Sequence, residues 1–263
     1  AFRMPSGRRL RGRWGGLLVV GMGGSASSDG GAGMAQALGA RLLDSAGRSL
    51  PLGAEALLRL ERIDAAALRG LLGGVRVIAV SDVVNPLLGP AGSARVYGPQ
   101  KGAGPAQVRL LEKALSRYAR ILRRDLGVEA GSVPGGGAAG GLGAGLRAFL
   151  RARLEPGAAW VLDRLDARRR IRAADLVVTG EGRLDAQSFL GKAPLELATL
   201  ARKEGKPVVV VCGTADPAIL PRLERMGVRV ETLLERGETV KECMARTPRR
   251  LQRLGRELAR SSR

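Results

Sequence analysis

Three segments of this chain combine glycine with carboxylate side chains, and each follows a short apolar run. They are 21–31 (GMGGSASSDGG), 81–89 (SDVVNPLLG) and 179–192 (TGEGRLDAQSFLGK). Glycine lets backbone N–H groups approach an anion closely, and a carboxylate among such groups can hold a metal ion or accept a proton. The recurrence of this pattern predicts a cleft that handles phosphate.

The chain contains no histidine, so its chemistry cannot use a Ser-His-Asp triad or the commonest general base and metal ligand. Catalytic groups must therefore come from Asp, Glu, Lys, Arg and backbone amides. Oxygen ligands of this kind favour magnesium over zinc. The two cysteines, Cys212 and Cys243, are expected to pack in the core in a reducing compartment.

The net charge of +20 raises the question of a nucleic-acid partner, with arginine gathered at 8–13, 168–172 and 246–263. Aromatic residues, which supply stacking surfaces for bases, make up only 3% of the chain. We therefore expect no nucleic-acid partner, and a basic face that speeds the encounter with an anionic substrate. No apolar run reaches about eighteen residues and the start lacks an apolar leader, which predicts a cytoplasmic protein without membrane contact.

Hydrophobic periodicity predicts the elements that hold the first two glycine segments. A strand is expected over 17–21 and a helix over 33–43, with a second buried strand over 75–80. An amphipathic helix is expected over 105–127. The Gly/Ala stretch 134–145 leads into a helical pattern that continues to residue 154.

From about residue 173 the sequence pattern changes, and predicted strands and helices alternate. Strands are expected at 176–179, 207–212 and 228–233, with helices at 194–203 and 217–225 and further helices to the end. This alternation is typical of βαβ units and a parallel sheet.

The length of 263 residues exceeds the usual size of one hydrophobic core. We therefore expect two α/β domains, 1–168 with the glycine-rich anion-binding loops and 169–263 with the alternating elements. The boundary is placed in the charged run near residue 169.

The segment 21–26 meets the minimal dinucleotide fingerprint, and Asp44 lies at the distance expected of a ribose-binding acid. However, residues 29–31 interrupt the start of the helix, and Asp44 is predicted to end a helix and not a strand. Neither Gly-Lys pair of the chain has the flanking residues of a P-loop. The match to common nucleotide motifs is therefore weak.

Four motifs closely resemble those of the type I bacterial glycerate kinase family and occur in that family's order. They are 23–34 (GGSASSDGGAGM), 82–89 (DVVNPLLG), 97–102 (YGPQKG) and 179–194 (TGEGRLDAQSFLGKAP). The resemblance covers roughly 16–212, and the last fifty or so residues are less distinctive.

The resemblance implies a two-domain α/β enzyme that phosphorylates D-glycerate with ATP and Mg²⁺, with 2-phosphoglycerate as the favoured product. One domain would be Rossmann-like with a parallel sheet, and the other would have an unrelated α/β fold. In that family the Rossmann-like domain is built from both chain ends. The segment 173–263 should therefore belong to it, and 16–168 should form the inserted domain.

The chain departs from the family at its beginning. It has Ala1 where a gene product starts with Met, and no counterpart of the family's N-terminal Asp-Ser-Phe-Lys-type and Ala-Asp-Gly-Gly-Glu-type segments. A truncation or a misread gene start would account for this, and would leave the Rossmann-like domain incomplete. Ser81 also stands where the family often has cysteine, a change expected to be harmless.

Phosphoryl transfer requires in-line placement, neutralisation of charge on the phosphoryl oxygens and a carboxylate that accepts the hydroxyl proton. We assign Asp185 as the candidate base and Lys192 as the cation that faces phosphate. Asp82 and Glu181 are the candidate magnesium ligands. Asp29 is either a further functional carboxylate or a helix cap, since Asp favours helix starts.

Other polar groups in the same motifs are expected to bind the anionic substrate or a phosphate. Lys101 stands out because lysine is rare in this arginine-rich chain and offers a compact point charge. The expected binding residues are Gly23, Gly24, Ser25, Asp29, Gly30, Gly31, Asn85, Gln100, Lys101, Gly180, Gly182 and Gln187.

Three functions remain open at this point, and the kinase is favoured by its four motifs. The alternatives are an NAD(P)-dependent oxidoreductase and a non-catalytic remnant of the kinase family that binds an anion. The expected ligand is the small molecule D-glycerate, and a homodimer is left open.

Overall fold

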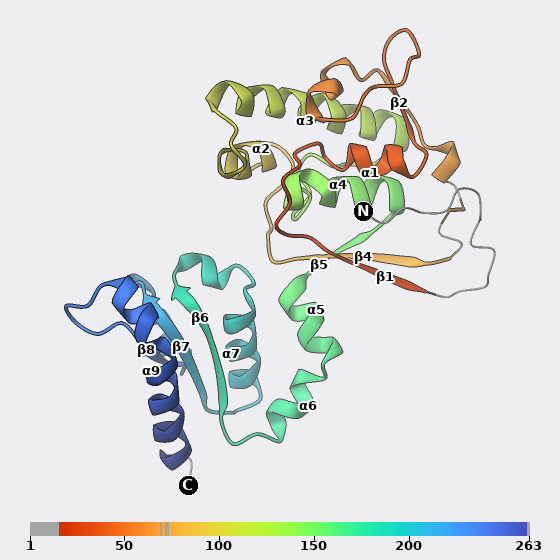
Figure 1. Ribbon diagram of the computed structural model, residues 1–263. Helices are drawn as coiled ribbons and strands as arrows, with labels where there is room; N and C mark the ends of the chain where they lie inside the picture. The colour runs from red at the N-terminus through yellow and green to blue at the C-terminus, as the bar shows by residue number, and fades with distance from the viewer. Residues whose placement is uncertain (1–15, 69, 72–73, 262–263) are drawn as a thin grey trace. The chain divides into compact units, whose positions relative to one another are not determined.

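The structure is a computed structural model that describes residues 16–68, 70–71 and 74–261 (Figure 1). The arginine cluster at 8–13 therefore lies outside the described residues. The chain divides into two compact units between Pro156 and Gly157, and each is α/β. The sequence placed this boundary at 168/169. It falls earlier because α5 (Gly157–Arg164) and α6 (Ala167–Arg172) pack against a helix of the second unit, α7 (Ala193–Lys203).

The first unit contains a three-stranded parallel sheet. Its order is β1 (Leu17–Gly21), β4 (Arg76–Ser81), β5 (Arg153–Pro156), with β4 in the centre. The register pairs Gly21 with Val80, so β1 and β4 end side by side. The segments 22–31 and 81–89 therefore leave the same edge of the sheet, which is where ligands bind in parallel α/β sheets.

Most of the rest of the first unit consists of helices and short 3₁₀ turns. They are α1 (Ala32–Ala37), η1 (Ala54–Arg59), η2 (Ala66–Leu68), α2 (Ser93–Tyr97), η3 (Pro99–Lys101), α3 (Pro105–Leu126) and α4 (Ala138–Leu150). The prediction of α3 is confirmed: Leu115, Tyr118 and Leu122 of its apolar stripe are fully buried, and Gly127 ends it in the left-handed conformation.

Two expected helices end earlier than the sequence predicted. The helix over 33–43 stops at Ala37, because Gly39 has φ +104° and the chain then forms β2 (Arg41–Leu43). This strand pairs antiparallel with β3 (Arg62–Asp64), so Asp44 follows a strand and not a helix. Likewise α4 ends at Leu150, after which the chain enters β5.

The second unit also contains a three-stranded parallel sheet, as the alternating pattern predicted. Its order is β6 (Val177–Leu184), β7 (Val208–Ala215), β8 (Arg229–Thr232). The connecting elements are α7, η4 (Ala186–Phe189), η5 (Pro217–Ile219) and α8 (Leu220–Arg225), and the last helix is α9 (Val240–Ser261). Because β6 extends to Leu184, the motif residues 180–184 lie in a strand and not in a loop.

Both faces of β7 are covered within this unit. Val208, Val210 and Cys212 pack in a core with α6 and α7, whereas Val209 and Val211 pack with Cys243 and Leu258 of α9. Both cysteines are buried and unbonded, as expected of packing residues. None of the helices among the described residues is long and apolar enough to cross a membrane.

Candidate functional site

The segment 22–31, called the glycine loop below, connects β1 to α1. Its first N–H group, at Met22, donates to the Val80 carbonyl, and that of Gly30 donates to the Gly140 carbonyl. Between them, the backbone N–H groups from Gly23 to Asp29 donate to no protein acceptor in the described part of the chain. Free backbone N–H groups can donate to an anion, so this loop is a candidate anion-binding segment.

A second glycine-rich segment, 140–145, packs closely against the glycine loop. A Cβ atom added at Gly141 would lie 2.8 Å from the Cα of Gly30, and one added at Gly145 would lie 2.6 Å from the Gly30 carbonyl oxygen. Only glycine permits two backbones to pack this closely. Ala139, which precedes this segment, adopts a left-handed conformation with φ 51°, a strained state for a residue with a side chain.

Asp29 acts as a cap at the start of α1. Its Oδ1 accepts a hydrogen bond from Gly31 N at 3.0 Å, and its Oδ2 accepts one from Gly33 N at 2.9 Å. Of the two roles that the sequence allowed, the geometry shows the cap. A direct role of Asp29 in binding stays a prediction.

Lys101 joins the glycine loop from η3. Its Nζ donates to Ser27 O at 2.6 Å and to Ser25 Oγ at 3.1 Å. Partial burial lowers the pKa of Lys101, and the negative charge of Asp29 opposes this shift. A cation is thereby fixed at the loop that carries the free amides. Its neighbour Gln100 is exposed and makes no side-chain hydrogen bond within the described residues.

The side chain of Asn85 organises the segment after β4. Its Nδ2 donates to Ala91 O at 2.8 Å, and its Oδ1 accepts from Tyr97 Oη at 2.7 Å. Burial raises the pKa of Tyr97, which keeps this phenol protonated as the donor. Both ends of the Asn85 amide are therefore used to fold the chain. Asp82, by contrast, is exposed directly after β4.

In the second unit, Glu181 and Lys192 form a pair with Oε2 and Nζ 3.5 Å apart. The Glu181 side chain is only 15% exposed, and its Oε1 is buried without a hydrogen-bond partner among the described residues. Burial, and secondly the charge of Glu181, raises the pKa of the adjacent Cys212 to about 11. A buried carboxylate oxygen without a partner fits the coordination of a cation such as Mg²⁺.

Asp185 lies between β6 and η4, where its Oδ1 accepts a hydrogen bond from Gln187 N at 2.9 Å. Its own N–H donates to Ser188 Oγ at 3.2 Å, which closes the turn. The second carboxylate oxygen of Asp185 lies 3.7 Å from Arg183 Nε. One oxygen of Asp185 thus fixes the turn and the other remains able to accept a proton.

The two glycines of this motif differ in their surroundings. Gly180 is required because an added Cβ would collide with the Val211 carbonyl oxygen of β7, whereas one at Gly182 would meet open space. The Gln187 side chain is exposed. Packing against β7 therefore excludes a side chain at position 180, whereas position 182 has space for one.

The predicted residues form two groups, one in each unit. The glycine loop and Lys101 come together in the first unit. In the second unit Glu181 and Lys192 form a pair, and Asp185 directly follows β6, the strand that carries Glu181. Asp82 and Glu181, the two expected magnesium ligands, belong to different units, and no group of three His, Cys, Asp or Glu side chains among the described residues could hold a metal ion. Sequence reasoning gave no role to Gly140 and Gly145, although the Gly/Ala composition of their segment was a signal.

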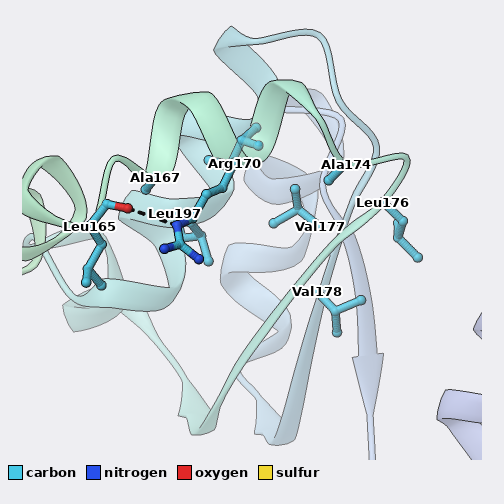
Figure 2. A pocket seen from close by; sticks show the side chains of 9 residues that line it. Leu165, Ala167, Arg170, Ala174, Leu176, Val177, Val178 and Leu197 are labelled. Carbon is cyan, nitrogen blue, oxygen red and sulfur yellow. Dashed lines mark hydrogen bonds between the residues drawn. The ribbon is translucent and has the colours of Figure 1, made fainter.

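An apolar pocket of about 390 Å³ lies elsewhere in the second unit (Figure 2). Side chains of α6, of the start of β6 and Leu197 of α7 line it. None of the predicted site residues borders it, so this pocket is separate from the polar groups described above.

A parallel α/β fold with a loop of free amides is compatible with the class of proteins that handle small anions. Comparison with known proteins makes this class specific. The model of the glycerate kinase family matches residues 16–263. The chain belongs to this family.

The curated relatives bear names from the same family. The chain is 45% identical over 197 residues to the glycerate 2-kinase of Escherichia coli K12. The aligned region covers 75% of this chain and 52% of that protein. It is 44% identical over 196 residues to the glycerate kinase of Haemophilus influenzae, covering 74% and 52%. The chain thus spans about half the length of these relatives.

A solved structure agrees with the sequence comparisons. It is a protein of Salmonella typhimurium LT2 assigned as a glycerate kinase 2, with a TM-score of 0.67 and 37% identity. The match covers 92% of this chain and 65% of that one. This likeness confirms the predicted α/β fold class.

Proposed function

We propose that this chain phosphorylates D-glycerate with ATP and Mg²⁺ and that the 2-hydroxyl is the favoured acceptor. The observation that carries the proposal is the row of free amides from Gly23 to Asp29 with the Lys101 ammonium group fixed beside it. The name of the Escherichia coli relative, glycerate 2-kinase, supports the choice of hydroxyl. The cytoplasm, which supplies ATP, is the expected compartment.

The glycine loop would bind an anionic group of one substrate, either the glycerate carboxylate or a phosphate. Exposed N–H groups of the loop would donate to its oxygens, and Lys101 would compensate its charge. Because Lys101 already holds Ser25 and Ser27, this cation is positioned before the anion arrives. Preorganised donors avoid the cost of ordering flexible groups on binding.

The groups in the second unit would act on the phosphoryl group. Asp185 would accept the proton of the glycerate hydroxyl group. The hydroxyl oxygen would bond to the γ-phosphorus of ATP as the bond to ADP breaks and ADP leaves. Lys192 would neutralise charge on the phosphoryl oxygens. Glu181, whose Oε1 has no partner among the described residues, would hold Mg²⁺. Asp82, in the first unit, stays a separate prediction as a magnesium ligand. Mg²⁺ supplies charge neutralisation of the phosphates when bound.

Phosphorus NMR of the chain with ATP, Mg²⁺ and D-glycerate tests this function. A 2-phosphoglycerate signal supports the proposal, whereas a 3-phosphoglycerate signal supports the kinase and contradicts the choice of hydroxyl. Absence of both, from folded chain that still binds D-glycerate, would identify a non-catalytic anion-binding protein. Gel filtration of the same sample decides whether a homodimer forms.

A matched pair of variants tests the base. Asp185 and Asp216 each cap a 3₁₀ turn with one carboxylate oxygen, at 2.9 Å from Gln187 N and from Ala218 N respectively. Asparagine preserves such a cap but cannot accept the proton. Asp185→Asn should lower turnover by about 10²-fold or more, and Asp216→Asn should leave it unchanged. Equal turnover of Asp185→Asn and wild type would exclude Asp185 as the base.

A further inference from the structure

Tyr118 of α3 carries a hydroxyl group that is not explained by packing. The side chain is fully buried, and its Oη has no hydrogen-bond partner among the described residues. Burying an unpaired hydroxyl costs free energy, and phenylalanine would fill the same space without that cost. The hydroxyl therefore calls for a role beyond filling the core.

The ring of Tyr118 lies directly against the glycine loop. A Cβ atom added at Gly30 would lie 2.6 Å from Cε1 and 2.8 Å from Cδ1 of this ring. Gly30 follows Asp29, whose carboxylate oxygens each accept one hydrogen bond, from Gly31 N and Gly33 N. Each of these oxygens can accept a second hydrogen bond.

Asp29 is also the charged group that acts on Tyr118. Burial raises the pKa of Tyr118, and the charge of Asp29 raises it further. The hydroxyl consequently stays protonated at neutral pH and is a donor. An anion bound at the free amides would bring a second negative charge close to the Asp29 carboxylate. A third hydrogen-bond donor to Asp29, besides Gly31 N and Gly33 N, would disperse the charge of that carboxylate.

We propose that Tyr118 is a positioning residue for the glycine loop, and that its hydroxyl donates a hydrogen bond to the Asp29 carboxylate in the arrangement that binds an anion. This inference rests on the proposed function. The hydrogen bond would fix the end of the glycine loop and the first turn of α1, where Gly31 and Gly33 donate to the same carboxylate. Tyr118 would act through Asp29 and would not touch the substrate.

The test compares Tyr118→Phe with Ser93→Ala. Ser93 carries another buried hydroxyl without a partner among the described residues, on α2. Tyr118→Phe should weaken D-glycerate binding about tenfold in calorimetry and speed hydrogen exchange at the Gly31 and Gly33 amides, with a melting temperature at or above that of the wild type. Ser93→Ala should change neither binding nor exchange.

Two results would separate this inference from the proposed function. If Tyr118→Phe binds D-glycerate and exchanges its amides as the wild type does, the hydroxyl has no positioning role. If the wild type itself fails to bind D-glycerate but Tyr118→Phe still speeds exchange at Gly31 and Gly33 in the presence of inorganic phosphate, the positioning role stands and the proposed substrate is wrong. If neither binding nor a change in exchange is seen, both proposals fail.

Discussion

The guanidinium carbon of Arg222 lies 3.7 Å from the centroid of the Phe189 ring. Phe189 ends η4, the turn that begins after Asp185 and leads to Lys192, while Arg222 belongs to α8. The contact therefore attaches the turn with the expected base to a helix that follows β7. The position of Asp185 depends in part on a residue that carries none of the proposed chemistry.

Replacing Arg222 should impair the proposed reaction. Arg222→Ala removes the stacking contact, which costs about 0.5–1 kcal/mol at an exposed site, and should lower turnover several-fold because the turn is less well fixed. Arg225→Ala is the control, since the Arg225 side chain on the same helix bonds only to Pro221 O among the described residues. Steady-state kinetics with D-glycerate checks this. Equal losses in the two variants would mean that the stacking contact is irrelevant.

Gly30 should be far less tolerant of alanine than Gly47. Both have positive φ, +68° and +74°, but only at Gly30 would the new Cβ meet other atoms, with Tyr118 at 2.6 Å. We expect Gly47→Ala to cost about 1 kcal/mol from backbone strain alone and Gly30→Ala to cost about 3 kcal/mol or more. Urea denaturation measures both. Similar costs would show that Tyr118 can move aside.

Removing the cation at the glycine loop should weaken anion binding. Lys101→Met retains the aliphatic stem but loses the hydrogen bonds to Ser25 and Ser27, so D-glycerate affinity should fall about 30-fold. Lys113→Met removes an exposed lysine of α3 and should leave affinity unchanged. Calorimetric titration distinguishes the two. A comparable loss in both variants would indicate a general effect of net charge.

The attachment of α9 should weaken in acid. Glu238 and Arg250 form an ion pair whose side chains are 6% and 8% exposed, and the hydrogen bond from Arg250 lowers the pKa of Glu238 below 4.5. A carboxyl group whose pKa is lower in the folded than in the unfolded state stabilises the fold at pH values above its unfolded-state pKa. This contribution disappears as the pH falls through its folded-state pKa.

Melting temperatures measured from about pH 6 to about pH 3 test this dependence. Glu238→Gln should melt below the wild type at the upper end and show a flatter decline toward the lower end. A decline as steep as that of the wild type would assign the acid sensitivity to other carboxylates.

Periodicity located helix α3 and strands β4 and β7 well, because their apolar residues are buried in the core. It also located β1 and β8, although their residues are exposed or only partly buried. It failed at α1, where the helix ends at Ala37 and a short strand follows. Leu42 and Leu43 lie in that strand and are buried against elements distant in sequence. Spacing alone cannot distinguish such a strand from one more helical turn.

The site was less predictable than the fold. Composition pointed to Lys101 and to the acids, yet the hydrogen bonds of Asn85 to Tyr97 and Ala91 depend on how its segment folds back. Nothing in the sequence marks Arg222 as a neighbour of Phe189, since this pairing arises from the packing of α8. Tertiary contacts between distant segments leave no local pattern to detect.

The close contact of Gly30 and Gly31 with Gly141 and Gly145 has an evolutionary consequence. A side chain gained on either strip of backbone would displace the other, so neither strip can vary independently. Two stretches far apart in the chain should therefore change together or remain fixed together. In any collection of related sequences they would behave as a single inherited unit, and a protein that lost glycine in one would be expected to have lost the shape of both.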